Sequence, residues 1–164
     1  LTGCFNRAHA LEVLDAEIRR ARRSKLPLSL IMFDLDNFKE INDRHGHLCG
    51  DAVLASIGAK MKSELPGSDL KCRYGGDEFM VILPDTPLGG AKQVSENLRV
   101  ALESHPMTWN TEQVTVTASF GVGVVNPTDQ DPLAAVARAD AALYRAKERG
   151  RNDVQVEEQP TALV

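Results

Sequence analysis

Two adjacent carboxylates, Asp77 and Glu78, follow a pair of glycines near the middle of the chain. Carboxylates are ligands for hard divalent cations, so this pair could serve a metal-assisted reaction. The apolar runs on either side, 70–74 and 79–83, are typical of β-strands, and glycine pairs are common in tight hairpin turns. The sequence therefore predicts a hairpin with two acids at its tip. Because side chains alternate between the faces of a strand, we expect the two acids to point in opposite directions.

A second group of polar residues, 34–51, directly follows the apolar run 28–33. This run is predicted as a strand buried on both faces, and the end of such a strand is a common place for a site. Asp34 begins a pattern that could open a calcium loop. However, Phe38 takes a ligand position of that loop, and Lys39 stands where the sharp turn needs glycine. We therefore do not expect a calcium loop.

The elements that must position these acids alternate along the chain. Apolar periodicity, prolines and glycines predict helices at 8–24, 37–44, 51–65, 86–104 and 131–150, and strands at 28–33, 70–74, 79–83, 114–125 and 153–156. The order predicts an α+β fold with a mostly antiparallel central sheet flanked by helices. Within the strand at 114–125, Gly121 and Gly123 suggest a bend or a close approach of another backbone.

Composition sets further bounds on function. With 164 residues, 43% hydrophobic and 26% charged, the chain is expected to form one domain over 1–156 and a disordered tail over 157–164. The net charge of −4 disfavours nucleic acid as a partner. The basic residues at 19–25 are interpreted as a solvated helix end, with contact to a partner or an upstream segment as the alternative.

Metal clusters of cysteine and histidine, disulfides and membrane spans are not expected. The three cysteines are odd in number and widely spaced, which favours reduced thiols. His45 and His47 have no further cysteine or histidine at ligand spacing. No apolar run approaches the roughly 18 residues of a membrane span. We expect a cytoplasmic domain, from a parent protein that could carry a membrane anchor and an upstream regulatory region.

The segment 34–51 is similar to one signature motif of the GGDEF family of diguanylate cyclases, and Gly75-Gly76-Asp77-Glu78-Phe79 resembles the other. Further matches lie at 1–7, 117–121, 140–147 and 150–152. Several separated motifs in the right order are far more specific than the pentapeptide alone. The resemblance implies a fold like that of nucleotidyl cyclases and polymerase palm domains. It also implies condensation of two GTP molecules into cyclic di-GMP and two pyrophosphates.

The resemblance implies a metal site formed by the carboxylates of Asp34 and Asp77 and the backbone carbonyl of Leu35. Mg²⁺ suits these oxygen ligands, with Mn²⁺ as the alternative. The catalytic residues implied are Asp77, Glu78 and Lys39. Asp77 would hold the metal and help to activate the ribose 3′-hydroxyl, Glu78 would support the metal or the neighbouring backbone, and Lys39 would stabilise phosphate.

The guanine-binding residues implied by the resemblance are Asn42 and Asp51, with His47 close by. A carboxylate can accept hydrogen bonds from the ring N1–H and the exocyclic amine of guanine together, so Asp51 would select GTP over ATP. Two structural alternatives stay open. Asp51 could cap the helix that follows it, and His47 could only brace the loop between its flanking glycines.

The phosphate-binding residues implied are Phe38 and Lys39, at the start of a short helix with free N–H groups, and the basic pair Lys147 and Arg151. For this pair, an interaction with the helix macrodipole is the alternative. The family's product-inhibition motif Arg-x-x-Asp has Pro66 in place of its arginine and retains Asp69. Proline cannot pair with phosphate, so we expect weak feedback by cyclic di-GMP.

The implied reaction is attack of one ribose 3′-hydroxyl on the α-phosphate of another GTP, carried out twice with metal assistance. Each domain would hold one GTP, so turnover would need a homodimer. The alternative function is a catalytically weak module that binds GTP or cyclic di-GMP and signals by protein contact. Such a module usually lacks the paired acids, which this chain retains.

Overall fold

The computed structural model describes residues 2–65 and 67–158. In chain order the elements are α1 (Arg7–Ser24), β1 (Leu28–Leu35), α2 (Phe38–His45), α3 (His47–Glu64), β2 (Leu70–Arg73), β3 (Glu78–Pro84), α4 (Leu88–Ser104), β4 (Met107–Trp109), β5 (Glu112–Val114), β6 (Ala118–Val124), α5 (Pro132–Glu148) and β7 (Val154–Val156). The predicted alternation of helices and strands is confirmed, apart from an additional strand pair, β4 and β5.

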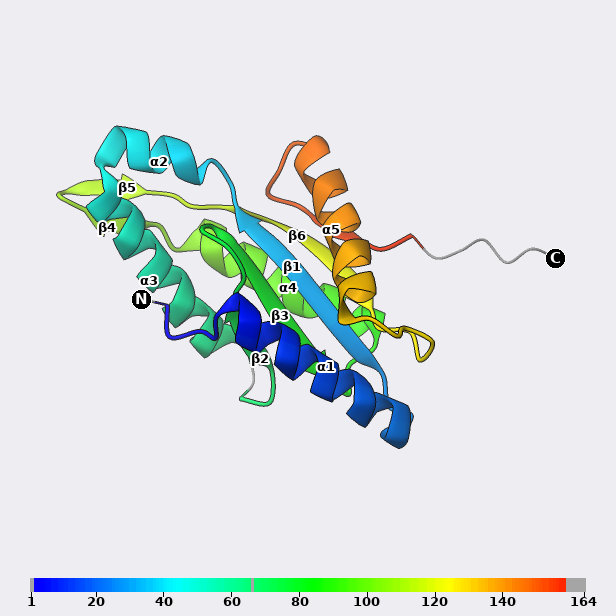
Figure 1. Ribbon diagram of the computed structural model, residues 1–164. Coiled ribbons are helices and arrows are strands. Elements are labelled where there is room, and N and C mark those ends of the chain that lie inside the picture. Colours follow the sequence, from blue (N-terminus) through cyan, green and yellow to red (C-terminus); the bar gives the residue numbers. More distant parts are fainter. Residues whose placement is uncertain (1, 66, 159–164) are drawn as a thin grey trace.

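One five-stranded sheet, in the order β2-β3-β1-β6-β7, forms the centre of the domain (Figure 1). β1 pairs antiparallel with β3 on one side and with β6 on the other. β2 is antiparallel to β3, and only the β6–β7 pair is parallel. The predicted α+β fold with a mostly antiparallel sheet is therefore confirmed.

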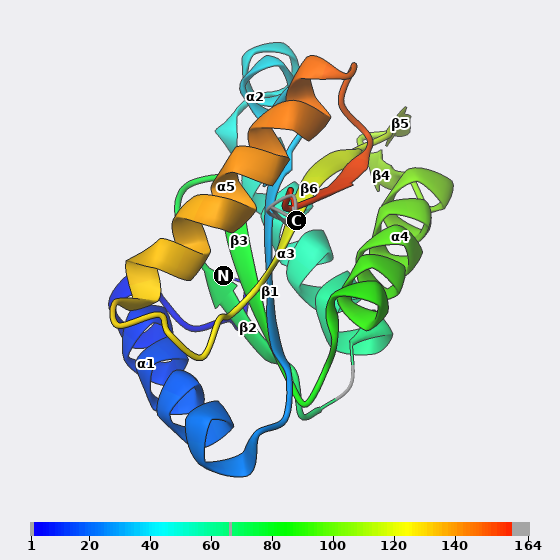
Figure 2. The same cartoon turned by 90° about the vertical axis from the view of Figure 1, so that its right-hand side faces the viewer.

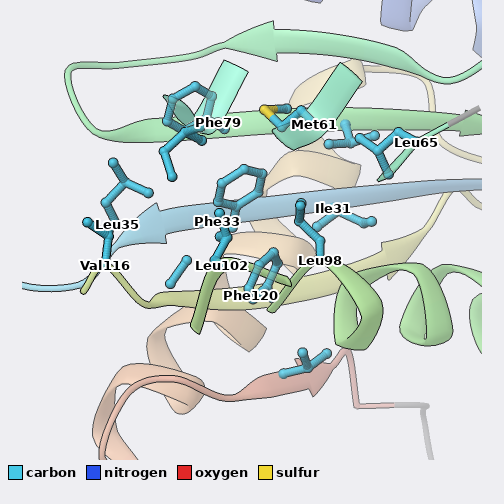
Figure 3. Close-up of a cluster of buried hydrophobic side chains, with 14 of the residues drawn as sticks. Ile31, Phe33, Leu35, Met61, Leu65, Phe79, Leu98, Leu102, Val116 and Phe120 are labelled. Atoms are coloured by element: carbon cyan, nitrogen blue, oxygen red, sulfur yellow. The ribbon is translucent and has the colours of Figure 1, made fainter. Parts of the chain in front are cut away.

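Helices cover both faces of this sheet, with α1 and α5 on one face and α3 and α4 on the other (Figure 2). Side chains of β1 alternate between the hydrophobic clusters on the two faces of the sheet: Leu30 and Met32 pack on the α1–α5 side, and Phe33 packs on the α3–α4 side. Phe33 stacks between Phe79 of β3 and Phe120 of β6, with ring centroids 5.0 and 4.9 Å apart (Figure 3). This buried stack fixes the three central strands side by side.

The expected close backbone approach in the sixth strand is confirmed at Gly121. A methyl group there would lie 2.8 Å from the Cα of Leu143 and still closer to the carbonyl oxygen of Ala139, both on α5. At Gly123 the nearest atom, the backbone nitrogen of Ala139, would be 3.4 Å away, which is an ordinary contact. Gly121 is therefore the position that lets α5 lie directly on β6.

The prediction of one strand over 114–125 is wrong. β6 begins only at Ala118, and the preceding residues form a separate antiparallel hairpin of β4 and β5. Its two turn residues, Asn110 and Thr111, both have left-handed backbones with φ of 47° and 74°. Two consecutive residues at positive φ match the twist of hairpin strands. Asparagine at position 110 is compatible with a left-handed turn, but the β-branched threonine at position 111 rarely adopts such a backbone, so the sequence does not indicate the turn.

The C-terminal boundary also differs from the expectation. Glu157, which was assigned to the tail, is only 7% exposed, and its backbone N–H donates to the carbonyl of Val122. Its carboxylate accepts a hydrogen bond from the backbone N–H of Val124 and lies 3.1 Å from Arg138 Nε. Glu157 is thus part of the folded domain, whereas the rest of the expected tail from residue 159 lies outside the described residues.

Three of the five basic residues at the end of α1 contact nearby acids or carbonyl groups. Arg19 forms an ion pair with Asp15, and Arg20 lies 3.4 Å from Asp85. Arg22 donates to the carbonyl of Pro127 at 3.3 Å. These contacts favour the solvated helix end over a partner surface. Among the described residues, no helix combines the length and apolarity needed to cross a bilayer.

The three cysteines, Cys4, Cys49 and Cys72, are free thiols, as predicted. Burial raises the pKa of the Cys49 thiol, and burial together with neighbouring Cys4 raises the pKa of Cys72 to about 12. A thiol with such a pKa is protonated at neutral pH and is a poor nucleophile or metal ligand. We therefore assign the buried cysteines to packing.

Candidate active site

The loop that joins β2 to β3, residues 74–77, presents the paired acids. The backbone N–H of Gly75 donates to the carbonyl of Glu78, and the guanidinium of Arg73 donates to the carbonyls of Gly75 and Gly76 at 3.2 and 2.7 Å. The hairpin is as predicted, but neither glycine has a positive φ. The expectation about the turn is therefore wrong in detail: the loop is longer than a two-residue turn, and an arginine side chain closes it.

The end of β1 meets this loop directly. Asp34 is the register partner of Glu78, and the backbone N–H of Leu35 donates to the carbonyl of Asp77 at 3.1 Å. The structure thus brings together the three residues of the expected metal site, although they come from distant parts of the sequence. Asp77 lies in the loop before β3, so the strand alternation assumed for it and Glu78 does not apply.

The carboxylate of Asp34 lies in a strongly polar but poorly solvated environment. Its Oδ2 is paired with the Nζ of Lys147 at the end of α5, while its Oδ1 is buried and has no hydrogen-bond partner among the described residues. Burial raises the pKa of Asp34, and the charges of Asp77 and Asp36 raise it further, against the opposing effect of Lys147. A buried acceptor without a donor is costly, so this oxygen is suited to a ligand.

Glu78 and Asp140 add to the negative charge around Asp34. Burial first, and then the charges of Asp34 and Asp140, raise the pKa of Glu78 to about 7. Burial and the charge of Asp34 likewise raise the pKa of Asp140 on α5. Lys147 is the cation that opposes these shifts most strongly at Asp34. Three half-buried carboxylates near one ammonium leave net negative charge at this point of the structure.

The sequence motifs assign no role to Asp140. The spacing of Asp140 and Lys147 could have indicated that Asp140 lies near the site, because residues seven apart lie on nearly the same face of a helix. Among the described residues, no three His, Cys, Asp or Glu side chains are arranged to hold a metal ion by themselves. The expected magnesium site does not need such a group. Magnesium is commonly held by one or two carboxylates together with water and substrate phosphates.

The candidate guanine-binding residues lie on α2 and α3, which follow the end of β1 (Figure 1). The Oδ1 of Asn42 is buried without a hydrogen-bond partner among the described residues, and a Cβ on Gly50 of α3 would collide with this amide. α3 begins at His47, so Asp51 lies inside the helix and the N-cap alternative for it is wrong. Both His47 and Asp51 are exposed and therefore accessible to a ligand.

The candidate phosphate-binding residues at the start of α2 are open to solvent or a ligand. Phe38 is the first residue of the helix, and the preceding Asn37 has φ of 55° and provides no side-chain cap. The first N–H groups of α2 are therefore not capped by this residue, and Lys39 beside them is exposed. Uncapped N–H groups at a helix start are suited to bind an anion.

The basic pair at the end of α5 lies at the same end of the sheet. Lys147 is ion-paired with Asp34, which places its ammonium at the acidic cluster and not simply at the helix end. Arg151 lies three residues beyond the end of α5 and is exposed. The macrodipole alternative accounts less well for Lys147, since this residue has a specific partner on another element.

The position expected for product inhibition is only partly described. Pro66, which replaces the arginine of the inhibitory motif, lies outside the described residues. Asp69, the retained acid, is only 6% exposed, and burial raises its pKa. A buried acid of this kind offers little to a ligand at the surface.

Comparisons with known proteins show which family the sequence resembles. A family model described as "Diguanylate cyclase, GGDEF domain" matches residues 1–153. Response regulator PleD of Caulobacter vibrioides is 40% identical over 156 residues, which are 94% of this chain and 34% of PleD. Diguanylate cyclase DgcP of Pseudomonas aeruginosa is 40% identical over 95% of this chain and 23% of DgcP. The chain thus spans about a third or less of these curated relatives.

Solved structures give the same result for the fold. The GGDEF domain of DgcB from Caulobacter crescentus, in complex with c-di-GMP, matches with a TM-score of 0.90 and 30% identity over 95% of this chain and 90% of that chain. The GGDEF domain of PA1120 from Pseudomonas aeruginosa matches with a TM-score of 0.90 and 33% identity over 98% of this chain and 100% of that chain.

Proposed function

The chain belongs to the GGDEF family of diguanylate cyclase domains, and on this basis we propose that it condenses two GTP molecules into cyclic di-GMP and two pyrophosphates. The observation that carries the proposal is the buried, unpartnered Oδ1 of Asp34 within a group of carboxylates at the end of β1. A packing role leaves that oxygen without a partner and the surrounding negative charge only partly balanced by Lys147.

The metal site proposed consists of the carboxylates of Asp34 and Asp77 and the backbone carbonyl of Leu35. Support comes from the hydrogen bond between Leu35 and Asp77, which holds the two chain segments together at 3.1 Å. The donor set is all oxygen, which suits Mg²⁺, with Mn²⁺ as the alternative. When bound, the cation would neutralise charge on the substrate phosphates and help to orient them.

The chain's own cations are proposed to bind the triphosphate. Lys39 and the N–H groups that begin at Phe38 would hold phosphate oxygens at the start of α2. Lys147 and Arg151 would approach the terminal phosphates from the end of α5. For Lys147 this requires its ammonium to turn from Asp34 toward the substrate, a small movement for a flexible lysine side chain.

Proton transfer and substrate choice are assigned to different residues. Asp77 would help to remove the proton from the ribose 3′-hydroxyl, while Glu78, on the same face as Asp34, would support this charge arrangement. Asn42 and Asp51 would hold guanine, with His47 nearby. The unpartnered amide oxygen of Asn42 supports this assignment, because guanine offers two adjacent N–H donors.

Each domain would hold one GTP, so we propose that turnover takes place between two copies facing each other. In the whole protein, an upstream regulatory region would control this pairing. We also propose that feedback by cyclic di-GMP is weak, because Pro66 replaces the arginine of the inhibitory motif. Calorimetric titration with cyclic di-GMP tests this point, and tight binding that Asp69→Asn abolishes would contradict it.

The main experiment is incubation with GTP and Mg²⁺ followed by chromatography of the products at several protein concentrations. We expect cyclic di-GMP, a rate per molecule that rises with protein concentration, and no product after removal of metal with EDTA. Asp77→Ala should lower the rate about a hundredfold or more. Asp15→Ala on α1 is the matched control, since its carboxylate pairs only with Arg19 on the same helix among the described residues. Nucleotide binding without cyclic product, even in a dimer, would favour the binding module.

A further inference from the structure

The carboxylate of Asp36 forms a buried hydrogen-bond network just beyond the proposed metal site. Asp36 is 6% exposed, and its side chain accepts hydrogen bonds from the hydroxyls of Thr117 and Ser119, each at 2.7 Å. It also accepts one from the backbone N–H of Asn152 at 2.9 Å. Its own backbone N–H donates to the carbonyl of Thr117 at 2.8 Å. These contacts join the end of β1 to the start of β6 and to the loop after α5.

The α5–β7 loop has a backbone conformation that needs such support. Gly150, Arg151 and Asn152 are consecutive and have positive φ values of 108°, 66° and 45°. Left-handed backbone is unfavourable for a residue with a side chain, so two such residues in a row persist only when other contacts hold them. The hydrogen bond from Asn152 to Asp36 is one of these contacts.

The side chain of Asn152 provides a second attachment, to α4. Its amide oxygen accepts a hydrogen bond from Arg99 at 3.2 Å, and its amide nitrogen donates to Glu103. The backbone N–H of Arg151 also donates to the carbonyl of Ala146 at 3.1 Å. Arg151 therefore projects from a loop that is fixed on both sides, while its own side chain is exposed.

We propose that Asp36 is a positioning residue for the GTP triphosphate, which acts by locking the α5–β7 loop so that Arg151 faces the end of β1. This inference rests on the proposed function. Two contacts fasten the end of α5 to the end of β1, on either side of Arg151 in sequence: the ion pair of Lys147 with Asp34 and the hydrogen bond of Asn152 with Asp36. Loss of the second would leave Arg151 free to move away from the phosphates.

A purely structural role for this carboxylate makes a different prediction, and Asp129 provides the comparison. Asp129 is 8% exposed and lies in the loop before α5, at the opposite end of that helix. It accepts hydrogen bonds from the backbone N–H of Asn126 at 2.9 Å and from Arg138 at 3.1 and 2.5 Å. Asp36→Asn and Asp129→Asn therefore each remove the charge of a buried carboxylate that anchors one end of α5.

The test compares equilibrium binding of GTP and of GMP to wild-type protein, Asp36→Asn, Asp129→Asn, Arg151→Ala and the double variant Asp36→Asn with Arg151→Ala. GMP lacks the terminal phosphates, so its affinity should not change in any variant. We expect Asp36→Asn to weaken GTP binding about tenfold, as the loss of one charged contact would. Asp129→Asn should lower the melting temperature to a similar extent and leave GTP binding unchanged.

The double variant is the decisive measurement. If Asp36 acts through Arg151, then Asp36→Asn should cause no further loss of GTP affinity once Arg151 has been replaced. An additive loss, or an equal loss of GMP affinity, would overturn the proposal. Should Asp36→Asn fail to fold, Thr117→Val removes one of the two hydroxyl donors that orient the carboxylate of Asp36, and a GTP-specific loss is again expected.

The readout separates this inference from the proposed function. GTP binding by wild-type protein without formation of cyclic di-GMP would refute the cyclase activity, and the binding comparison would still decide the role of Asp36. Absence of GTP binding in the wild-type protein would overturn both.

Discussion

Substitution of Gly121 by alanine tests the packing that places α5 against the sheet. The added methyl group would lie 2.8 Å from the Cα of Leu143, whereas ordinary contacts begin at 3.4 Å. The difference between these distances means that α5 must retreat from β6 by about 0.6 Å, and by more where the methyl group meets the carbonyl of Ala139. The obstructing atoms belong to a helix backbone, so they cannot rotate away as a flexible side chain could.

The magnitude follows from the cost of overpacking a core, which is typically 1–3 kcal/mol. Because backbone must move here, we expect a loss of about 3 kcal/mol in the free energy of unfolding. For a domain of this size, that loss lowers the melting temperature by roughly 6–12 °C. Lys147 lies one turn beyond Leu143 on α5, so its position at Asp34 should shift as well. We expect cyclase turnover per folded molecule to fall about tenfold.

The assay is urea unfolding followed by circular dichroism, with Gly123→Ala as the matched control. Gly123 is on the same strand and also faces Ala139, but an added methyl group would make only an ordinary contact at 3.4 Å. The control should therefore lie within about 1 kcal/mol of the wild-type protein. Equal stabilities of the two variants would refute our reasoning about the helix–sheet contact, because only the clearance distinguishes the two positions.

Three further predictions concern the core and two ionisable groups. Phe33→Ala should destabilise the domain by about 3–5 kcal/mol in urea unfolding, because the ring stacks on two others in the buried centre, and a loss below about 1 kcal/mol would contradict the packing described. The pKa of Glu78 is raised to about 7 in the folded state and therefore lies above its unfolded value, so its ionisation removes stability as the pH rises from about 4.5 to 7. Glu78→Gln should therefore be more stable than the wild-type protein at pH 8 but not at about pH 4. The opposite pattern in thermal melts would disprove the pKa shift. Burial opposes ionisation of Asp129, but hydrogen bonds from Arg138 and the backbone outweigh it and lower the pKa of Asp129. The ionised carboxylate of Asp129 thus contributes its full stability above about pH 4, which is its pKa in the unfolded chain, and this stability is lost as the pH falls through its lower pKa in the folded protein. Asp129→Asn should therefore lose stability less steeply than the wild-type protein in acid titration.

Most of the fold could be predicted from local patterns. The continuous apolar run 28–33 indicated the central strand β1, and periodic apolar residues indicated the helices. The start of α3 was missed, because Gly46 and Gly50 on either side of His47 resemble a loop in composition. In the structure Gly50 is a packing residue, since α2 brings Asn42 directly against it. A contact between two helices cannot be predicted from the local sequence pattern of either helix.

The candidate site was predicted in part. The motifs identified Asp34, Asp77 and Glu78, and the structure brings them together at the end of β1. The motifs gave no role to Asp140 or to the network of Asp36. Both depend on contacts with α5 and the loop after it, which are distant in sequence and become neighbours only when the helix packs on the sheet.

The sequence by itself determined which residues are chemically competent, which runs become strands and helices, and which family the chain resembles, because these depend on residue type and short-range spacing. Only the tertiary structure decided how charge is distributed among Asp34, Glu78, Asp140 and Lys147, and which backbone positions tolerate no side chain. The physical reason is that desolvation and Coulomb interactions depend on distance in space. That distance is set by the packing of α5 on β6, through a clearance of less than one methyl group at Gly121.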